Sequence, residues 1–190
     1  MRIAFFLPFA FACALAAAQK GPEITIPYDA ESQLYTYTEV VEVAEQTPAA
    51  LFRNAKSWLI DATGDTTSVE VVADTKLVDR GVVPVTFTFD AGMGVKTPFT
   101  WNTVYTITLE FKEGRYRYVI NKFNIGGDLA GSVPGMPLET YVKQHESMGI
   151  GKKRVIEQEE DFCAALELGM KKLVESMKAG VKAPKKATDW

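Results

Sequence analysis

The sequence predicts an α+β domain with the element order β-α-β-β-β-β-α. The first observation is an apolar stripe at helical spacing between residues 48 and 63. The second is a long stretch, from 69 to 125, in which apolar and polar side chains alternate as they do in strands. The third is another helical stripe, from about residue 157 to residue 178. Because consecutive strands with short connections favour an antiparallel meander, both helices are expected on the one apolar face of an antiparallel sheet.

The N-terminal residues 1–18 have the features of a cleaved signal peptide. Arg2 supplies a positive charge, residues 3–15 are almost entirely apolar, and Ala16 and Ala18 provide small residues for a signal peptidase. The apolar run is too short for a membrane span, since a spanning helix needs about 20 residues. We therefore expect export to the periplasm or the cell exterior, with no stable membrane span after cleavage.

Cleavage after residue 18 would leave residues 19–190, which is long enough for one domain with a substantial core. Loss of Arg2 leaves 20 of the 21 basic residues against 24 acidic ones, a net charge of −4. Nucleic-acid-binding domains need a basic footprint, so nucleic acid is not an expected partner. Cys13 leaves with the signal peptide, so Cys163 cannot form an internal disulfide and packing must stabilise the domain.

The first helix follows a polar lead-in and a strand. Residues 19–34 form the lead-in, and residues 35–43 are rich in the Tyr, Thr and Val residues that favour strands. Thr47 is an N-cap candidate, Pro48 stands at the first helical position, and Gly64 is expected to end the helix. The apolar stripe of this helix consists of Leu51, Phe52, Ala55, Trp58, Leu59 and Ala62.

Two strands are expected between residues 69 and 90. A short one at 69–73 is followed by a second that begins at Leu77. Pro84 lies within the second strand and cannot donate a hydrogen bond to a neighbouring strand. The strand is therefore expected to be bent, or to lie at a sheet edge, at this residue.

The next two strands form a hairpin. Alternation is most regular from residue 101 to residue 111, and Glu113 and Gly114 are a tight-turn signal. On the returning strand the apolar parity shifts after Asn121. A shift of parity within one strand indicates a β-bulge.

The remainder of the chain is expected to hold a long loop, a helix and a tail. Residues 126–156 are interpreted as the loop, with four glycines and two prolines in its first part and a weak helical pattern later. The helix is expected over residues 157–178, and residues 180–190 as a flexible tail. The single domain would therefore span residues 35–179.

Three segments resemble a known family. They are the Tyr/Val strand at 35–43, the Pro-started helix with Ala-Lys-Ser-Trp-Leu at 55–59, and Lys-Glu-Gly-Arg-Tyr-Arg-Tyr at 112–118. Residues 35–125, and the last helix more loosely, resemble a secreted domain-of-unknown-function family of Bacteroidota with a TATA-binding-protein-like (TBP-like) fold. The resemblance implies a curved antiparallel sheet with two helices on one face and an exported Gram-negative protein. It carries over no catalytic residue, and the 126–156 segment departs from the minimal pattern.

The sequence carries no recognisable catalytic, cofactor-binding or metal-binding motif. His145 and Glu146 begin a zinc-peptidase motif, but Gly149 stands where the second histidine is required. Cys163 follows Phe162 in an amphipathic helix, which is typical of a thiol packed as a small hydrophobic side chain. We therefore expect no catalytic residue, no cofactor and no metal.

Two sets of side chains are candidates for binding. The first is aromatic and could line an apolar ligand pocket against the last helix, although residues at strand spacing are more often plain core. It consists of Trp101, Tyr105, Tyr116, Tyr118 and Phe162. The second is basic and could meet an anionic partner, although surface charges are often simply solvated. It consists of Lys112, Arg115 and Arg117.

Three functions remain open on these observations. The leading hypothesis is an exported, non-enzymatic binding or interaction domain whose partner is an unknown envelope protein. The alternative is a carrier that holds a small apolar ligand between the sheet and the C-terminal helix. The third is a hydrolase whose carboxylates only the fold would bring together.

Overall fold

The computed structural model describes residues 24–63, 69–90, 95–146 and 152–182. Its strands are β1 (Tyr28–Asp29), β2 (Leu34–Tyr35), β3 (Tyr37–Glu42), β4 (Glu70–Ala73), β5 (Lys76–Asp90), β6 (Lys96–Lys112), β7 (Arg115–Ile125) and β8 (Met136–Pro137). Its helices are α1 (Pro48–Thr63), α2 (Leu138–Glu146) and α3 (Lys152–Lys182). The predicted signal peptide lies outside the described residues.

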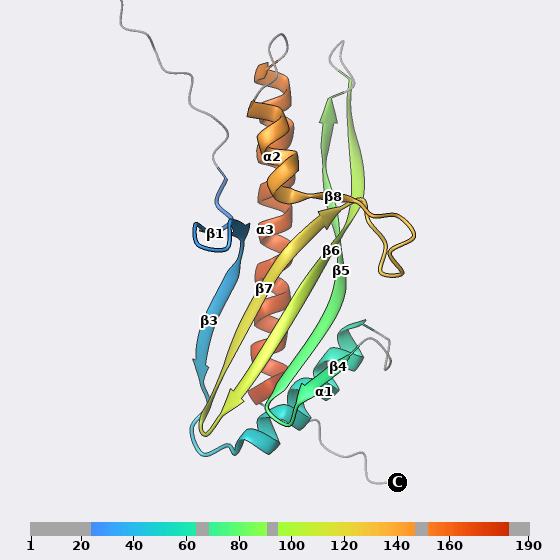
Figure 1. The fold of residues 1–190 in the computed structure, drawn as a ribbon. Helices are drawn as coiled ribbons and strands as arrows, with labels where there is room; N and C mark the ends of the chain where they lie inside the picture. The colour runs from blue at the N-terminus through green and yellow to red at the C-terminus, as the bar shows by residue number, and fades with distance from the viewer. Residues whose placement is uncertain (1–23, 64–68, 91–94, 147–151, 183–190) are drawn as a thin grey trace, which may run out of the picture.

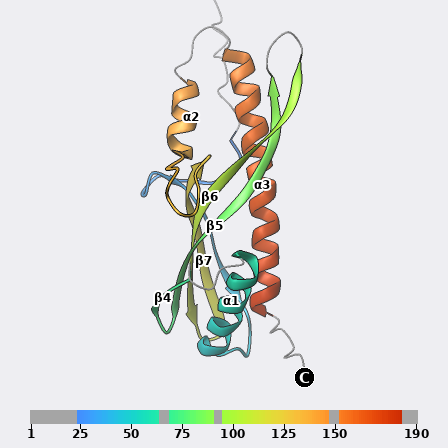
Figure 2. The same cartoon turned by 90° about the vertical axis from the view of Figure 1, so that its right-hand side faces the viewer.

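The main sheet is antiparallel throughout, with the strand order β3-β7-β6-β5-β4, and β8 pairs with β7. Figure 1 shows the strands in front of α3, and Figure 2 shows α1 and α3 on the same side of the sheet. In Figure 1 no described helix covers the lower half of the other face, which is called the outer face below. The predicted fold class, including two helices on one face, is confirmed.

Helix α1 begins as its sequence predicts. The backbone N–H of Ala50 donates a hydrogen bond to the Thr47 hydroxyl oxygen at 3.3 Å, which caps the first turn. Leu51 and Leu59 are fully buried on the side that contacts the sheet and α3. The indole N–H of Trp58 donates to the Ser176 hydroxyl at 3.1 Å, so α1 is also tied to α3 by a polar contact.

Helix α3 is longer than predicted at both ends. It begins at Lys152 and continues to Lys182, so a flexible tail starting at residue 180 is wrong for its first residues. Val181 is fully buried, and the Gln46 side chain donates to the Lys182 carbonyl at 2.8 Å. These contacts hold the last turn against the start of α1. Residues 183–190 lie outside the described part.

The segment predicted as a long loop contains a helix. Helix α2 occupies Leu138–Glu146, and Leu138, Tyr141 and Val142 are buried. Figures 1 and 2 both place α2 beside the N-terminal half of α3. Its helical state follows from this packing, because nine residues are too few for a stable helix in isolation. The Gly149–Gly151 turn lies outside the described residues.

The predicted lead-in is also partly structured. Strands β1 and β2 pair antiparallel, with Tyr28 opposite Tyr35 and their ring centroids 5.2 Å apart. Ile26 is only 2% exposed and belongs to the core. Treating residues 19–34 as outside the domain was therefore wrong for the part of that segment that the structure describes. Tyr35 belongs to this hairpin, and the sheet strand begins at Tyr37.

The central strands confirm two predicted irregularities. Strand β4 pairs only with the first residues of β5, so no described strand pairs with β5 on that side at Pro84. In β7, Asn121 pairs with Thr106 while Asn124 pairs with Val104, so β7 carries one extra residue. Lys122 lies in this bulge with a left-handed φ of 55°. The bulge turns Phe123 inward, which explains the shifted apolar parity of the sequence.

Candidate functional site

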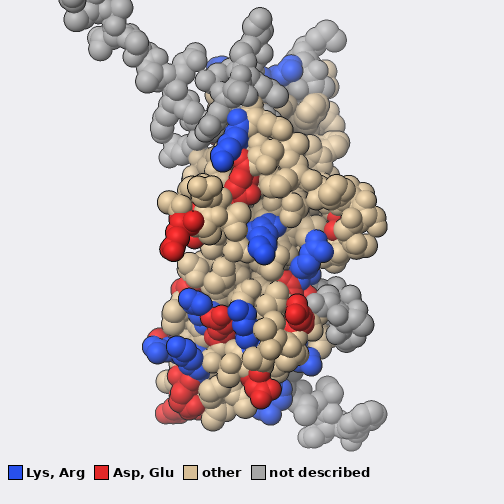
Figure 3. All heavy atoms as spheres, in the orientation of Figure 1, with Lys and Arg blue, Asp and Glu red and all other residues tan. Residues whose placement is uncertain are grey.

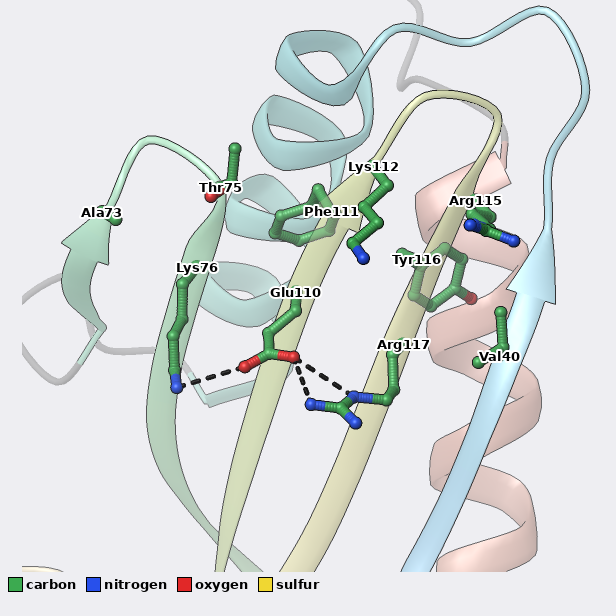
Figure 4. A pocket seen from close by; sticks show the side chains of 10 residues that line it. All are labelled: Val40, Ala73, Thr75, Lys76, Glu110, Phe111, Lys112, Arg115, Tyr116 and Arg117. Atoms are coloured by element: carbon green, nitrogen blue, oxygen red, sulfur yellow. Dashed lines mark hydrogen bonds and ion pairs between the residues drawn. The ribbon is translucent and has the colours of Figure 1, made fainter.

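A hollow of about 560 Å³ lies on the outer face of the sheet, next to the turn that joins β6 and β7. Figure 4 shows its side chains, which come from five neighbouring strands and the turn between β4 and β5. We call it the basic hollow. Its lining residues are Val40, Ala73, Thr75, Lys76, Glu110, Phe111, Lys112, Arg115, Tyr116 and Arg117.

The strand register builds a row of alternating charges across the hollow. Arg117, Glu110 and Lys76 are direct neighbours on β7, β6 and β5, so their side chains share a face. The Arg117 guanidinium donates to Glu110 Oε2 from Nε at 3.2 Å and from Nη2 at 2.5 Å. The Lys76 ammonium lies 3.2 Å from Glu110 Oε1. One carboxylate therefore contacts two cations in this row, as the dashed lines in Figure 4 show.

The next row, closer to the turn, also holds two cations and one carboxylate, but its charges are not in ion-pair contact. Lys112 and Arg115 are direct cross-strand neighbours, and Glu42 lies opposite Arg115 on β3. Within the part of the chain that the structure describes, neither Lys112 nor Arg115 forms an ion pair. Like charges placed directly opposite each other destabilise a sheet. The hollow therefore holds two cations without an ion pair among the described residues, beside a row in which one carboxylate contacts both cations.

The electrostatics of Glu110 follow from this arrangement. Hydrogen bonds from Arg117, assisted by the Lys76 ammonium, lower the pKa of the Glu110 carboxyl below its ordinary value. Glu110 is therefore ionised at neutral pH and occupies the cations of its own row. Figure 3 shows that basic side chains, with carboxylates among them, gather over the lower half of this face.

The hollow also has an apolar component. Val40 is 51% exposed on the outer face, where it lies directly opposite Arg117. Phe111 and Tyr116 line the hollow as well, although both are almost fully buried. A hollow that combines cations with apolar surface can bind a partner through both kinds of contact.

Residues 37–125 match the model of a family described as a domain of unknown function (DUF4468) with TBP-like fold. This segment belongs to the DUF4468 family. The matched segment contains the whole of β3 to β7, and therefore every residue that lines the basic hollow.

Two solved structures resemble the chain that contains this DUF4468 domain. A TBP-like protein from Parabacteroides distasonis has a TM-score of 0.59 at 13% identity, covering 83% of this chain and 97% of its own. A DUF4468 family protein from Bacteroides ovatus has a TM-score of 0.57 at 10% identity, covering 85% of this chain and 93% of its own. Both likenesses concern the fold alone. No curated protein is significantly similar in sequence, and no described helix is long and apolar enough to span a membrane.

The three predicted basic residues of the DUF4468 domain lie together. Lys112, Arg115 and Arg117 all line the basic hollow, and their role as a binding surface stays a prediction. Lys76 and Glu110 were missed, because their place depends on the pairing of β5 with β6. The alternation of apolar and polar residues along β6 places Glu110 on the outer face. This alternation was the sequence signal that could have identified Glu110 as a surface residue.

Four of the five predicted aromatic residues lie in the core, and the fifth, Trp101, is partly buried and packs against it. The ring of Phe162 lies 5.8 Å from that of Trp101, and Tyr116 and Tyr118 are nearly inaccessible. Tyr105 packs against the backbone of Gly81. Of these five residues, only Tyr116 lines either of the two hollows described, so the apolar-carrier hypothesis stays a prediction without a cavity assigned to it.

A second hollow and several ionisable or nucleophilic side chains lie outside the basic hollow. The second hollow, about 190 Å³, lies between the β1–β2 hairpin and α2. The buried carboxylates Asp79 and Glu159 line neither hollow. Among the described residues, no cluster of three or more potential metal ligands is found. Cys163 is buried, and the side chain of His145 lies outside what the structure describes.

Proposed function

We propose that this protein is an exported, non-enzymatic binding domain, and that the basic hollow receives an anionic part of its partner. The observation that carries the proposal is the pairing of Lys112 with Arg115. The two cations stand directly opposite each other on β6 and β7, without an ion pair among the described residues. An anion placed between them would relieve their repulsion and accept charge-assisted hydrogen bonds from both.

The neighbouring row supports this interpretation. There, Glu110 bridges Arg117 and Lys76, so both cations of that row already have a carboxylate partner. The chain as a whole has a net charge of −3, which makes a hollow with four cations and one carboxylate a local exception. A local excess of cations also speeds the approach of an anionic partner.

Export is the second part of the proposal, and the N-terminal residues support it. Arg2, the apolar run at 3–15 and the small residues up to Ala18 have the order of a secretory signal. The mature protein would then meet its partner in the periplasm or outside the cell. Expression of the full chain in a Gram-negative host should yield protein that begins at Gln19, measured as intact mass. Uncleaved protein that stays in the cytoplasm would contradict export.

Retention on immobilised heparin, a polyanion, tests the binding surface. The double substitution Lys112→Glu/Arg115→Glu should elute at clearly lower salt than wild type. The matched control is Arg154→Glu/Lys172→Glu, which changes one arginine and one lysine at exposed positions of α3. Both variants have the same net charge, so only a localised site separates them.

Equal elution of the two double variants would contradict the proposal, because retention would then depend on net charge alone. Circular dichroism of both variants shows whether the fold is retained. Because Lys112 and Arg115 are exposed and lie outside the core cluster, both variants are expected to fold.

A further inference from the structure

We infer that the basic hollow is a site for a small amphipathic organic anion, with a single carboxylate held by Lys112 and Arg115 and an apolar body over Val40. This inference rests on the proposed function and names the ligand class. Three features of the hollow carry it: its volume, the position of Val40 and the fixed counter-ion Glu110.

The volume fits a small molecule. Pockets for small ligands typically occupy about 300–1,000 Å³, and the basic hollow measures about 560 Å³. A flat sheet face that bound only a macromolecular surface would not require such a depression. The hollow lies where β3, β7, β6 and β5 run side by side (Figure 4).

The apolar contact lies at a defined place relative to the cations. Val40 pairs with Arg117, and Glu42 pairs with Arg115, so Val40 is the diagonal neighbour of Arg115. Diagonal neighbours in an antiparallel pair are separated by about 7–8 Å. A carboxylate at Arg115 would therefore leave a bicyclic ring or short alkyl chain over Val40. Covering this half-exposed side chain removes apolar surface from water.

The charge of the ligand is limited by Glu110. This carboxylate already holds Lys76 and Arg117, which leaves Lys112 and Arg115 as the cations that a ligand can use. A second negative charge on the ligand would lie close to Glu110 and be repelled. The site therefore favours a monocarboxylate over a dianion such as phosphate.

The test uses 2-naphthoate as the probe in isothermal titration of the purified protein. We expect saturable binding of one probe per chain, and clearly weaker binding of 2-naphthamide, acetate and inorganic phosphate. The first of these competitors lacks the charge, the second lacks the apolar body, and the third carries the wrong charge. Lys112→Gln/Arg115→Gln should lower the association constant at least about tenfold, since each lost charged hydrogen bond is worth a factor of that order.

Two further variants separate this inference from the proposed function. Val40→Ser should weaken 2-naphthoate binding several-fold while leaving heparin retention unchanged, because only the apolar contact is lost. The control Arg154→Gln/Lys172→Gln should bind the probe as wild type does.

Each outcome has one meaning. The inference of an amphipathic ligand is wrong if acetate or phosphate binds as well as 2-naphthoate, or if Val40→Ser does not change the affinity for 2-naphthoate. In either case, heparin retention that depends on Lys112 and Arg115 would still support the proposed function. If neither heparin retention nor probe binding depends on Lys112 and Arg115, both proposals fail.

Discussion

Tyr105 on β6 packs its ring directly against the backbone of Gly81, the residue opposite it on β5. A Cβ atom at Gly81 would lie 2.2 Å from the Tyr105 hydroxyl oxygen and 2.3 Å from Cζ. The absence of a side chain at Gly81 therefore makes room for an aromatic ring that covers the strand. Such pairs of glycine and aromatic residue help to fix the register of neighbouring strands.

The first prediction concerns this contact. Gly81→Ala should lower the free energy of unfolding by about 1–3 kcal/mol, because the ring must leave its place and the core is overpacked. Urea denaturation followed by tryptophan fluorescence measures the change. In a Tyr105→Ala background the same substitution should cost much less, since the obstructing ring is gone. Equal costs in both backgrounds would show that the contact does not constrain Gly81.

The second prediction concerns Glu110. Glu110→Gln should raise the affinity for 2-naphthoate about threefold or more, because Lys76 and Arg117 lose their fixed counter-ion and attract the probe. Stability should change by less than about 1 kcal/mol, since the ion pairs are exposed. Titration calorimetry at low salt measures the affinity, and added salt should reduce the gain.

A matched control for this substitution is Glu157→Gln. Glu157 is an exposed carboxylate that faces Lys153 on α3, outside the basic hollow. Its removal should leave probe affinity unchanged. If both glutamine variants raise affinity equally, the gain comes from net charge and not from Glu110.

Much of the fold could be predicted from the sequence because its long elements bury regular stripes. The alternation along β6 and the apolar spacing of α1 correspond directly to buried positions. The shift of parity around Lys122 predicted a real bulge. The missed elements are short, and tertiary contacts stabilise them: Tyr141 of α2 lies with its ring centroid 5.4 Å from that of Phe162.

Of the basic hollow, the sequence predicted only the residues beside the β6–β7 turn, because the local geometry of that turn places them. The Glu113–Gly114 turn fixes Lys112 opposite Arg115, and Gly114 adopts the left-handed φ of 65° that such a turn needs. Lys76 lies in the hollow because β5 pairs with β6 so that Lys76 is opposite Glu110. This register could not be read from the sequence. The aromatic set has the spacing of either a core or a pocket, so only the packed structure distinguishes the two.

The third prediction concerns Cys163. Burial, with a further contribution from the nearby Glu159 carboxylate, raises the pKa of the Cys163 thiol to about 12. The thiolate is therefore scarce at neutral pH, and the buried sulfur is shielded from reagents. Iodoacetamide at pH near 8 should leave the folded protein unlabelled and label the urea-unfolded protein fully, measured by intact mass. Rapid stoichiometric labelling of folded protein would point to a reactive thiol and revive a nucleophilic role.

The fourth prediction concerns the edge of the sheet, where the Lys178 ammonium contacts Glu39 Oε1 at 2.8 Å and Oε2 at 2.6 Å. The Tyr118 hydroxyl donates to the same carboxylate at 3.0 Å. The hydrogen bond from Lys178, ahead of that from Tyr118, lowers the pKa of Glu39 below its ordinary value. This stabilisation is therefore complete above the unfolded-state pKa and is lost as the pH falls through the lower folded-state value.

Acidification should therefore narrow the difference between wild type and Lys178→Met. At pH near 6 the variant should be the less stable of the two, and between about pH 5 and pH 3 their free energies of unfolding should converge. The effect is small because Glu39 is well exposed and the pair is screened by water, so the sign carries the test. Lys172→Met, an exposed change on the same helix, should show no such convergence. Urea denaturation across this range measures all three proteins, and parallel curves for wild type and Lys178→Met would mean that the pair contributes nothing to stability.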